Sequence, residues 1–229
     1  MKRTRKPRPQ SEQKRLAILD AAARAIAEHG FHGMSMRDLA AETGQVVAGL
    51  YNYFASKDEV LFEIQSSAFE TLIATAEGAL RGVASPEERL FAFIYQHVRY
   101  VAEHPDVMRV LVHEAGALPP QKRAKVRALK QRYYDLCRGI VADLYRETAR
   151  GGRGELERVT YGTFGMINWV YGWYQPKRHG TPGEVARSLH RLALSGLSAR
   201  SRDITDIEFD IERRLSVVTP LPLLGRGKS

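Results

Sequence analysis

Apolar side chains recur at helical spacing along this chain of 229 residues, and no long alternating run of β-branched residues interrupts them. In the first stretch four apolar residues fall on one stripe of an amphipathic helix, namely Leu16, Leu19, Ala23 and Ile26. Gly30 is expected to end that helix, because glycine readily adopts the left-handed backbone of a C-terminal cap. The sequence therefore predicts an all-α fold whose core forms between helices.

Start and stop signals divide the rest of the chain into further helices. Two capping-box pairs mark helix starts: Ser35 with Asp38, and Ser56 with Glu59. A long helix is expected between the proline pair at 119–120 and the glycine pair at 151–152. The other helices are expected over residues 35–43, 46–53, 57–81, 86–103, 106–115, 155–174, 182–199 and 203–215. Residues 216–229 are expected to form a loose tail.

Positive charge is concentrated at the start of the chain. The net charge is +9, and residues 1–15 hold seven basic side chains against one acid, Glu12. Residues 1–13 are rich in charge and proline and contain almost no apolar side chain, which predicts a flexible arm. Polyanions such as nucleic acid are natural partners of such an arm, because each neutralised phosphate releases counterions. A tail that only raises solubility is the alternative.

Several other classes of protein are not expected. The only cysteine, Cys137, excludes an intramolecular disulfide and favours a cytoplasmic location. Residues 159–176 lack charge, but their glycines and polar side chains favour a buried or interfacial helix, so no membrane partner is expected. The scattered histidines lack metal-ligand spacing, and no metal or cofactor is expected. An enzyme is not expected either, since there is no Gly-x-Ser-x-Gly elbow and no phosphate-binding loop.

A helical corner near the N-terminus indicates a function. The predicted helices over 35–43 and 46–53 are joined by a tight turn at Gly44, which is typical of a helix-turn-helix whose second helix enters the major groove of DNA. Tyrosine hydroxyls and a lysine ammonium group near this corner suit phosphate contacts, whereas Phe54 is expected in the core. Many helical proteins contain such a corner, so plain core packing remains an alternative.

The residues around the corner resemble a known family. Residues 35–44 read Ser-Met-Arg-Asp-Leu-Ala-Ala-Glu-Thr-Gly, and residues 50–61 read Leu-Tyr-Asn-Tyr-Phe-Ala-Ser-Lys-Asp-Glu-Val-Leu. This pattern closely resembles the signature of the TetR (tetracycline-repressor-like) family, over about residues 14–62. The resemblance implies a three-helix DNA-binding domain over 14–56. It also implies a helical domain over 57–215 that binds a ligand and dimerises.

The same resemblance implies which residues contact DNA. Arg37 would contact phosphate, Gln45 to Gly49 would enter the major groove, and three anchors would hold the DNA backbone: Tyr51, Tyr53 and Lys57.

Three positions depart from the family pattern, which commonly has hydroxyl or longer polar side chains at Val46, Val47 and Gly49. Gln45 can still read adenine, and Val46 or Val47 can pack on a thymine methyl group. The basic arm could add readout by placing Arg3 or Arg5 in a neighbouring minor groove. Deletion of residues 2–9 without any change in operator affinity would contradict that hypothesis.

The second half of the chain is expected to form a homodimer. Glycines and both tryptophans, Trp169 and Trp173, lie close together in the predicted helix over 155–174, a composition typical of obligate interfaces. The resemblance implies a four-helix dimer bundle built from this helix and the helix over 182–199, which carries Leu189 and Leu192. A monomer with these aromatic residues in its own core is the alternative.

The effector is expected to be a small hydrophobic molecule or an acyl-CoA, since a similar aromatic segment occurs in family members that sense acyl-CoA thioesters. Six basic residues between 122 and 132 could hold its phosphates or could form a solvated helix face: Lys122, Arg123, Lys125, Arg127, Lys130 and Arg132. The candidate pocket residues are Phe69, Phe93, His97, Tyr100, Met108 and Tyr133, which could equally be ordinary core residues.

Together these features predict a repressor that binds a palindromic operator of double-stranded DNA as a dimer and leaves it when the effector binds. An effector that favours the form unable to bind DNA must weaken DNA affinity reciprocally. The helix over 57–81 joins both halves and is the expected lever. The alternative function is that of a small-molecule-binding helical regulator or adaptor that does not itself bind DNA. Neither the effector nor the operator sequence follows from the residues.

Overall fold

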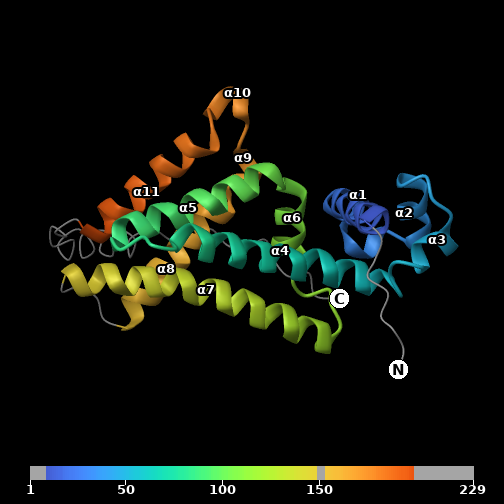
Figure 1. The fold of residues 1–229 in the computed structure, drawn as a ribbon, viewed down its shortest axis with the longest axis horizontal. Helices are drawn as coiled ribbons and strands as arrows, with labels where there is room; N and C mark the ends of the chain where they lie inside the picture. The colour runs from blue at the N-terminus through green and yellow to red at the C-terminus, as the bar shows by residue number, and fades with distance from the viewer. Residues whose placement is uncertain (1–8, 149–152, 199–229) are drawn as a thin grey trace, which may run out of the picture. The chain divides into compact units, whose positions relative to one another are not determined.

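The computed structural model describes residues 9–148 and 153–198, which form helices and contain no strand (Figure 1). The all-α fold is therefore confirmed. In chain order the helices are α1 (Pro9–Gly33), α2 (Met36–Glu42), α3 (Val47–Tyr51), α4 (Lys57–Leu80), α5 (Pro86–Glu103), α6 (Pro105–His113), α7 (Pro120–Thr148), α8 (Arg153–Asn168), α9 (Val170–Trp173), α10 (Pro176–His179) and α11 (Pro182–Ser198).

The helix ends agree closely with the local sequence signals, with two differences. The expected helix over 155–174 is divided into α8 and α9 at Trp169, whose N–H reaches the carbonyl of Gly165 at a stretched 3.4 Å before the next turn tightens. The short helix α10 was not expected; Gly180 ends it with a φ of 74°. The arm with Arg3 and Arg5, the predicted helix over 203–215 and the tail over 216–229 lie outside the described residues.

The buried face of α1 differs slightly from the predicted stripe. Leu19, Ala23 and Ile26 are buried as expected, but Leu16 is 53% exposed. Ile18 and Ala22, four residues apart on a neighbouring side of α1, are buried as well. Gly30 turns the chain with a φ of 74° and a ψ of 158°, and the helix resumes for one short turn to Gly33.

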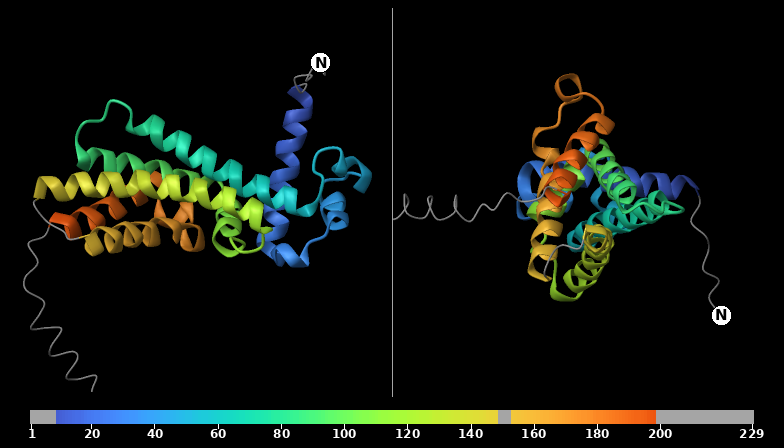
Figure 2. Two further views of the ribbon diagram at one scale, coloured as in Figure 1. Left: turned by 90° about the horizontal axis from the view of Figure 1, so that it is seen from below. Right: turned by 90° about the vertical axis from the view of Figure 1, so that its left-hand side faces the viewer.

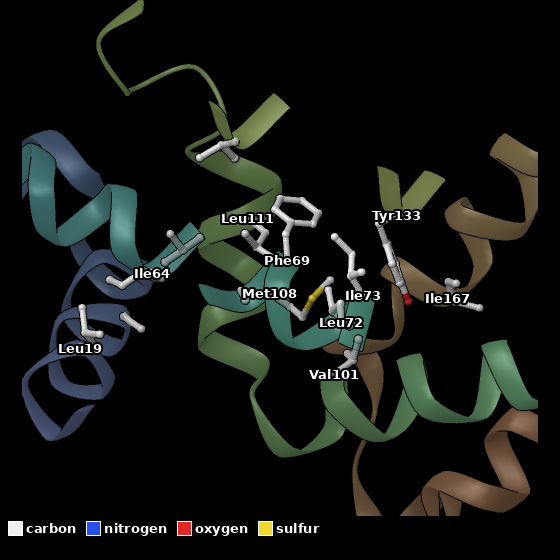
Figure 3. Close-up of a cluster of buried hydrophobic side chains, with 14 of the residues drawn as sticks. Leu19, Ile64, Phe69, Leu72, Ile73, Val101, Met108, Leu111, Tyr133 and Ile167 are labelled. Carbon is white, nitrogen blue, oxygen red and sulfur yellow. The ribbon is translucent and has the colours of Figure 1, made fainter. Parts of the chain in front are cut away.

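Helix α4 connects the two halves of the described chain. Its first turns pack against α1, and its later turns pack between α5 and α7, which run alongside it (Figures 1 and 2). Ile64 meets Leu19 of α1, whereas Leu72 faces Met108 of α6 (Figure 3). The apolar core is continuous along α4, so a shift of this helix at one end reaches the other end.

No helix of the described residues is both long enough and apolar enough to cross a lipid bilayer.

Candidate DNA-binding surface, effector cavity and dimer face

The corner between α2 and α3 is held by local hydrogen bonds. The N–H of Ser35 donates to Asp38 Oδ2 at 2.8 Å, and the N–H of Asp38 donates to Ser35 Oγ at 3.2 Å, which completes the predicted capping box. Gly44 takes a φ of 63°, which glycine adopts without strain. Gln45 then returns its N–H to the carbonyl of Ala40 at 2.9 Å. These bonds fix the direction in which α3 leaves the turn.

Helix α3 is anchored on one side and bare on the other. Leu50 and Phe54 are buried and hold it to the core, so the predicted core position of Phe54 is confirmed. Val46, at the N-cap, is 74% exposed and makes no side-chain cap, while Tyr51 is 52% exposed. The exposed side of α3 therefore begins with Val46, an apolar residue that does not cap the helix, and ends with the phenol ring of Tyr51.

The other predicted DNA contacts differ in exposure. Arg37 on α2 is exposed, and the half-buried residues are Gln45, Val47, Gly49 and Tyr53. Val47 and Tyr53 pack partly against the core, which leaves their edges for a ligand. A methyl group added at Gly49 would lie 3.6 Å from Val46 Cγ2, which is an ordinary contact. The protomer itself therefore has room for a side chain at this position. DNA contact by these residues stays a prediction.

The ammonium group of Lys57 points into the protein. Its Nζ donates to the carbonyls of Phe31 and Met34, both at 2.9 Å, and lies 4.4 Å from the centroid of the Phe31 ring. An ammonium group has three N–H donors, so one remains for a phosphate. Lys57 thus braces the turn between α1 and α2 in addition to its predicted role as a DNA anchor.

A second brace joins this turn to α6. The Oε1 atom of Glu114, the residue after α6, accepts the backbone N–H of Phe31 at 3.0 Å, and the carbonyl of Glu114 accepts Gln65 Nε2 of α4 at 3.0 Å. Gly30 lies beside this carboxylate. Sequence reasoning missed Glu114 because its partner is 83 positions away and no local pattern indicates the pairing.

A cavity of about 250 Å³ lies among α4, α5, α6, α7 and α8. Four of the six predicted pocket residues line it: Phe69, His97, Met108 and Tyr133. Lys130, one of the six basic residues that could hold effector phosphates, also lines it. The other lining residues were not predicted from the sequence: Leu72, Leu111, Val112, Tyr134, Tyr161, Phe164 and Asn168. The walls are mainly apolar and aromatic, as in most small-molecule sites. Ligand binding by the four predicted residues remains a prediction.

Phe93 and Tyr100 do not line this cavity. Phe93 is fully buried in the core, where its ring stacks on Tyr133 at a centroid distance of 5.0 Å. Tyr100 has its ring 4.8 Å from that of His104, the residue after α5. Burial, and secondarily the charge of Asp20, raises the pKa of Tyr100. Neither side chain faces the cavity, although Phe93 packs behind Tyr133, which lines it.

His97 is the most unusual polar residue at the cavity. It is buried, and its Nδ1 lies 2.9 Å from the hydroxyl oxygen of Tyr133. Burial lowers the pKa of His97 to about 3, although the neighbouring Asn168 opposes the shift, so the imidazole is neutral at physiological pH. The buried Cys137, by contrast, has its pKa raised to about 12 by burial, which makes its thiol a poor nucleophile.

The burial of His97 predicts a pH-dependent stability. Its pKa is lowered on folding, so below about pH 6.5 the unfolded chain takes up a proton that the folded chain does not. Stability is therefore full above that pH and is lost as the pH falls toward 3. We expect a loss of about 2 kcal/mol from this residue between about pH 7 and pH 5.

Chemical denaturation at the two pH values measures this loss. The variant His97→Gln has no titrating group at this position. Between about pH 7 and pH 5 its free energy of unfolding should therefore fall by about 2 kcal/mol less than that of the wild type. Equal pH dependence in the two proteins would contradict a buried neutral His97.

The basic residues of α7 are mostly engaged within the chain. Lys122 pairs with Glu59, Arg132 pairs with Glu77, and Arg123 donates to the carbonyl of Leu118. Lys125 lies over the ring of Phe62. Among the described residues these partners occupy four of the six basic side chains that could hold phosphates, and of the six only Lys130 lines the cavity.

Helices α8 and α11 present exposed apolar faces. Tyr161 and Gly165 of α8 and Trp169, the residue after its end, follow one another at intervals of four, and Trp169 is 61% exposed. On α11 Leu192 is 63% exposed and Leu189 is half-buried. The predicted interface residue Trp173 is half-buried, with its ring 5.0 Å from that of His179. Exposed apolar side chains of this size gathered on one helix face indicate a partner surface.

Among the described residues no group of histidine, cysteine or carboxylate side chains is arranged to hold a metal ion.

Comparisons with known proteins identify both halves of the chain. Residues 18–64 match the family model described as "Bacterial regulatory proteins, tetR family", and residues 83–197 match "Tetracyclin repressor-like, C-terminal domain". The first match contains the corner between α2 and α3. The second contains α5 to α11 almost entirely, including the exposed face of α8.

Individual relatives extend along most of the chain. The TetR family transcriptional regulator PfmR from Thermus thermophilus is 33% identical, with a TM-score of 0.70 over 80% of this chain and 99% of that one. AibR, solved in complex with isovaleryl coenzyme A and operator DNA, is 25% identical, with a TM-score of 0.69 over 78% of this chain and 97% of its own. The transcriptional repressor KstR2 of Mycobacterium tuberculosis is 25% identical over 82% of this chain and 95% of the relative. The chain therefore belongs to the TetR family of transcriptional regulators.

Proposed function

We propose that the protein is a dimeric transcriptional repressor that leaves its operator when a small effector fills the cavity. The supporting observation is the path from cavity to DNA-binding corner. Met108, Leu111 and Val112 of α6 line the cavity, and Glu114 at the end of the same helix holds the backbone of Phe31. An effector that moves α6 therefore also moves the turn that precedes α2. The protein acts by binding, without chemistry of its own.

The bare side of α3 is the proposed reading surface. Val46 and Tyr51 project from it, and Arg37 of α2 is exposed near the N-terminus of its helix, where a phosphate is also stabilised by the helix dipole. Val46, Val47 and Gly49 have no side-chain hydrogen-bond donor, which favours contacts with thymine methyl groups and with the DNA backbone over a dense set of base-edge hydrogen bonds.

The exposed faces of α8 and α11 are the proposed dimer interface. Dimerisation has a mechanical purpose, since two copies of α3 must lie about 34–36 Å apart to enter successive major grooves on one side of the DNA. Glycines at 162 and 165 allow another helix to approach α8 closely, because a side chain there would meet nothing within 4 Å in the same protomer.

Operator binding tests the proposal directly. The full-length protein should shift a DNA fragment from upstream of its own gene, as one dimer per site, with an affinity that falls steeply as salt rises. Binding to no DNA at low salt, with the protein intact and dimeric, would instead support a regulator or adaptor that does not bind DNA.

The proposed effector is a small hydrophobic compound or an acyl-CoA. The AibR complex with isovaleryl coenzyme A supports this class, and so does Lys130, a cation that lines the otherwise mainly apolar cavity. Of the other basic residues over 122–132, Lys122 and Arg132 are paired with carboxylates, and none lines the cavity.

The contact of Glu114 with Phe31 should carry the signal. We expect Glu114→Ala to fold and to bind operator, but to respond less to effector, because the link from α6 to the DNA-binding corner is lost. The ratio of operator Kd with and without effector should fall toward one from a wild-type value of roughly 5–150. Glu114→Gln keeps an acceptor oxygen and should retain most of the response; an unchanged ratio in Glu114→Ala would contradict this route.

A further inference from the structure

The Nε2 atom of His97 is left without a hydrogen bond at the cavity wall. It is buried and has no partner of good hydrogen-bond geometry among the described residues, while the side chain of Asn168, which lines the same cavity, lies near enough to the imidazole to raise its pKa. Most buried polar atoms in folded proteins have a hydrogen-bond partner, and an exception beside a cavity is a candidate contact for a ligand atom.

The protons of the neighbouring groups show which kind of atom fits. Gln96 Nε2 donates to the hydroxyl oxygen of Tyr133 at 2.7 Å, and Gln96 Oε1 accepts Thr75 Oγ1 at 2.8 Å. Burial raises the pKa of Tyr133 well above its usual value, so the hydroxyl keeps its proton. We infer that this proton is donated to Nδ1 of His97, 2.9 Å away, because a proton on Nδ1 would leave the buried hydroxyl proton of Tyr133 without an acceptor.

With Gln96 oriented to donate to Tyr133, one neutral tautomer of His97 follows. A neutral imidazole carries one proton, and when Nδ1 accepts, the proton is on Nε2. His97 therefore offers an uncharged N–H donor at a mainly aromatic and apolar wall, whose other N–H donors are Asn168 and Lys130. Gln96 and Tyr133 act as positioning residues for that donor.

We propose that Nε2–H of His97 donates to the carbonyl oxygen of a compact acyl group, presented as a neutral thioester and not as a free carboxylate. This inference rests on the proposed function and specifies its effector. A buried carboxylate would lose its hydration for a single neutral donor, an exchange that is strongly unfavourable, whereas a carbonyl oxygen needs only one such bond.

The size of the cavity limits the acyl group. About 250 Å³ is slightly below the roughly 300–1,000 Å³ of usual small-molecule pockets, which favours a short, branched or single-ring group over a long chain. Lys130, exposed and without a partner among the described residues, is placed to attract the anionic remainder of the ligand. The site is thus suited to a ligand with a neutral, buried acyl end and a charged end near the surface.

The tautomer is tested without any ligand. In the full-length protein with ¹⁵N-labelled histidine, the two-bond nitrogen–proton correlations of His97, assigned with His97→Gln, should have the pattern of a neutral ring protonated at Nε2. The pattern of a ring protonated at Nδ1, or of a charged ring, would overturn the inference. In Tyr133→Phe the fixed preference should weaken, because the donor to Nδ1 is removed.

The carbonyl contact is tested with matched ligands. Isovaleryl-CoA and a panel of other short acyl-CoA thioesters are titrated beside the corresponding S-alkyl-CoA thioethers, which lack only the carbonyl oxygen. We expect the wild type to bind the best thioester about tenfold more tightly than its thioether, as the loss of one buried hydrogen bond requires. In His97→Leu the ratio should fall to about one, and in His97→Gln, which can place an N–H near the same point, it should partly return.

The outcomes separate this inference from the proposed function. Equal binding of thioester and thioether by the wild type, or an undiminished ratio in folded His97→Leu, overturns the carbonyl contact alone. Failure of the whole panel to bind while operator is still bound overturns the acyl effector and leaves the DNA-binding function standing. If His97→Leu does not fold, the wild-type ratio and the tautomer measurement still decide.

Discussion

Replacing Gly165 by glutamine is expected to convert the dimer into a monomer and to weaken operator binding by roughly 10²–10⁴-fold. The glycine is exposed on α8 between Tyr161 and Trp169, and a side chain there meets nothing within its own protomer. The protomer should therefore fold normally, with its stability raised by up to about 1 kcal/mol through helix propensity. In the proposed dimer, however, a second α8 at close range would have no room for the added atoms.

The loss of affinity follows from the loss of the second half-site. A dimer binds its second half-site as an intramolecular event, and this advantage disappears when the protomers separate. Gly139→Gln is the matched control, since Gly139 is also an exposed helical glycine with open space around it but lies on α7. Sedimentation and mobility-shift measurements should find the control dimeric with unchanged affinity. A dimeric Gly165→Gln with full affinity would place the interface elsewhere.

Val46→Asp should make the protein more stable and a much weaker DNA binder. Val46 is the N-cap of α3 and makes no cap, so aspartate in its place is expected to raise the free energy of unfolding by about 1 kcal/mol. The same carboxylate would face DNA phosphates and base edges in both half-sites. At about 1.4 kcal/mol for each half-site, the operator Kd should rise about a hundredfold.

Val46→Ser distinguishes the cap from the charge. Serine also caps the helix, and it adds no charge, so the gain in stability should remain while operator affinity stays within about threefold of the wild type. Thermal or chemical unfolding and salt-controlled mobility shifts measure the two effects separately. Equal affinities of the aspartate and serine variants would mean that the exposed side of α3 does not meet DNA.

Local signals were sufficient to predict most of the fold. The capping box at Ser35 and the proline at the start of α5 act within one turn of helix, and the corresponding helices begin where these residues place them. The break at Trp169 and the helix α10 have weaker local signals, because glycines and an isolated proline are compatible with several backbone conformations.

The functional sites were harder to predict, because periodicity separates buried from exposed faces without saying what a buried face meets. Phe93 and His97 lie one turn apart on the same side of α5, yet only His97 lines the cavity. Lys57 has the right type and position for a DNA anchor, but its use as an internal brace depends on carbonyls 26 and 23 positions away. Pairing over such distances has no signature in a single sequence.

The two braces of the DNA-binding corner have an engineering consequence. Lys57 and Glu114 bind the carbonyls of Phe31 and Met34 and the N–H of Phe31, which are main-chain atoms that every amino acid except proline supplies. Exchange of residues 14–56 for the matching segment of another family member would therefore keep all three contacts. The effector-binding half should therefore control DNA-binding domains from other family members, each with its own operator. This makes it a transferable module for biosensor chimeras.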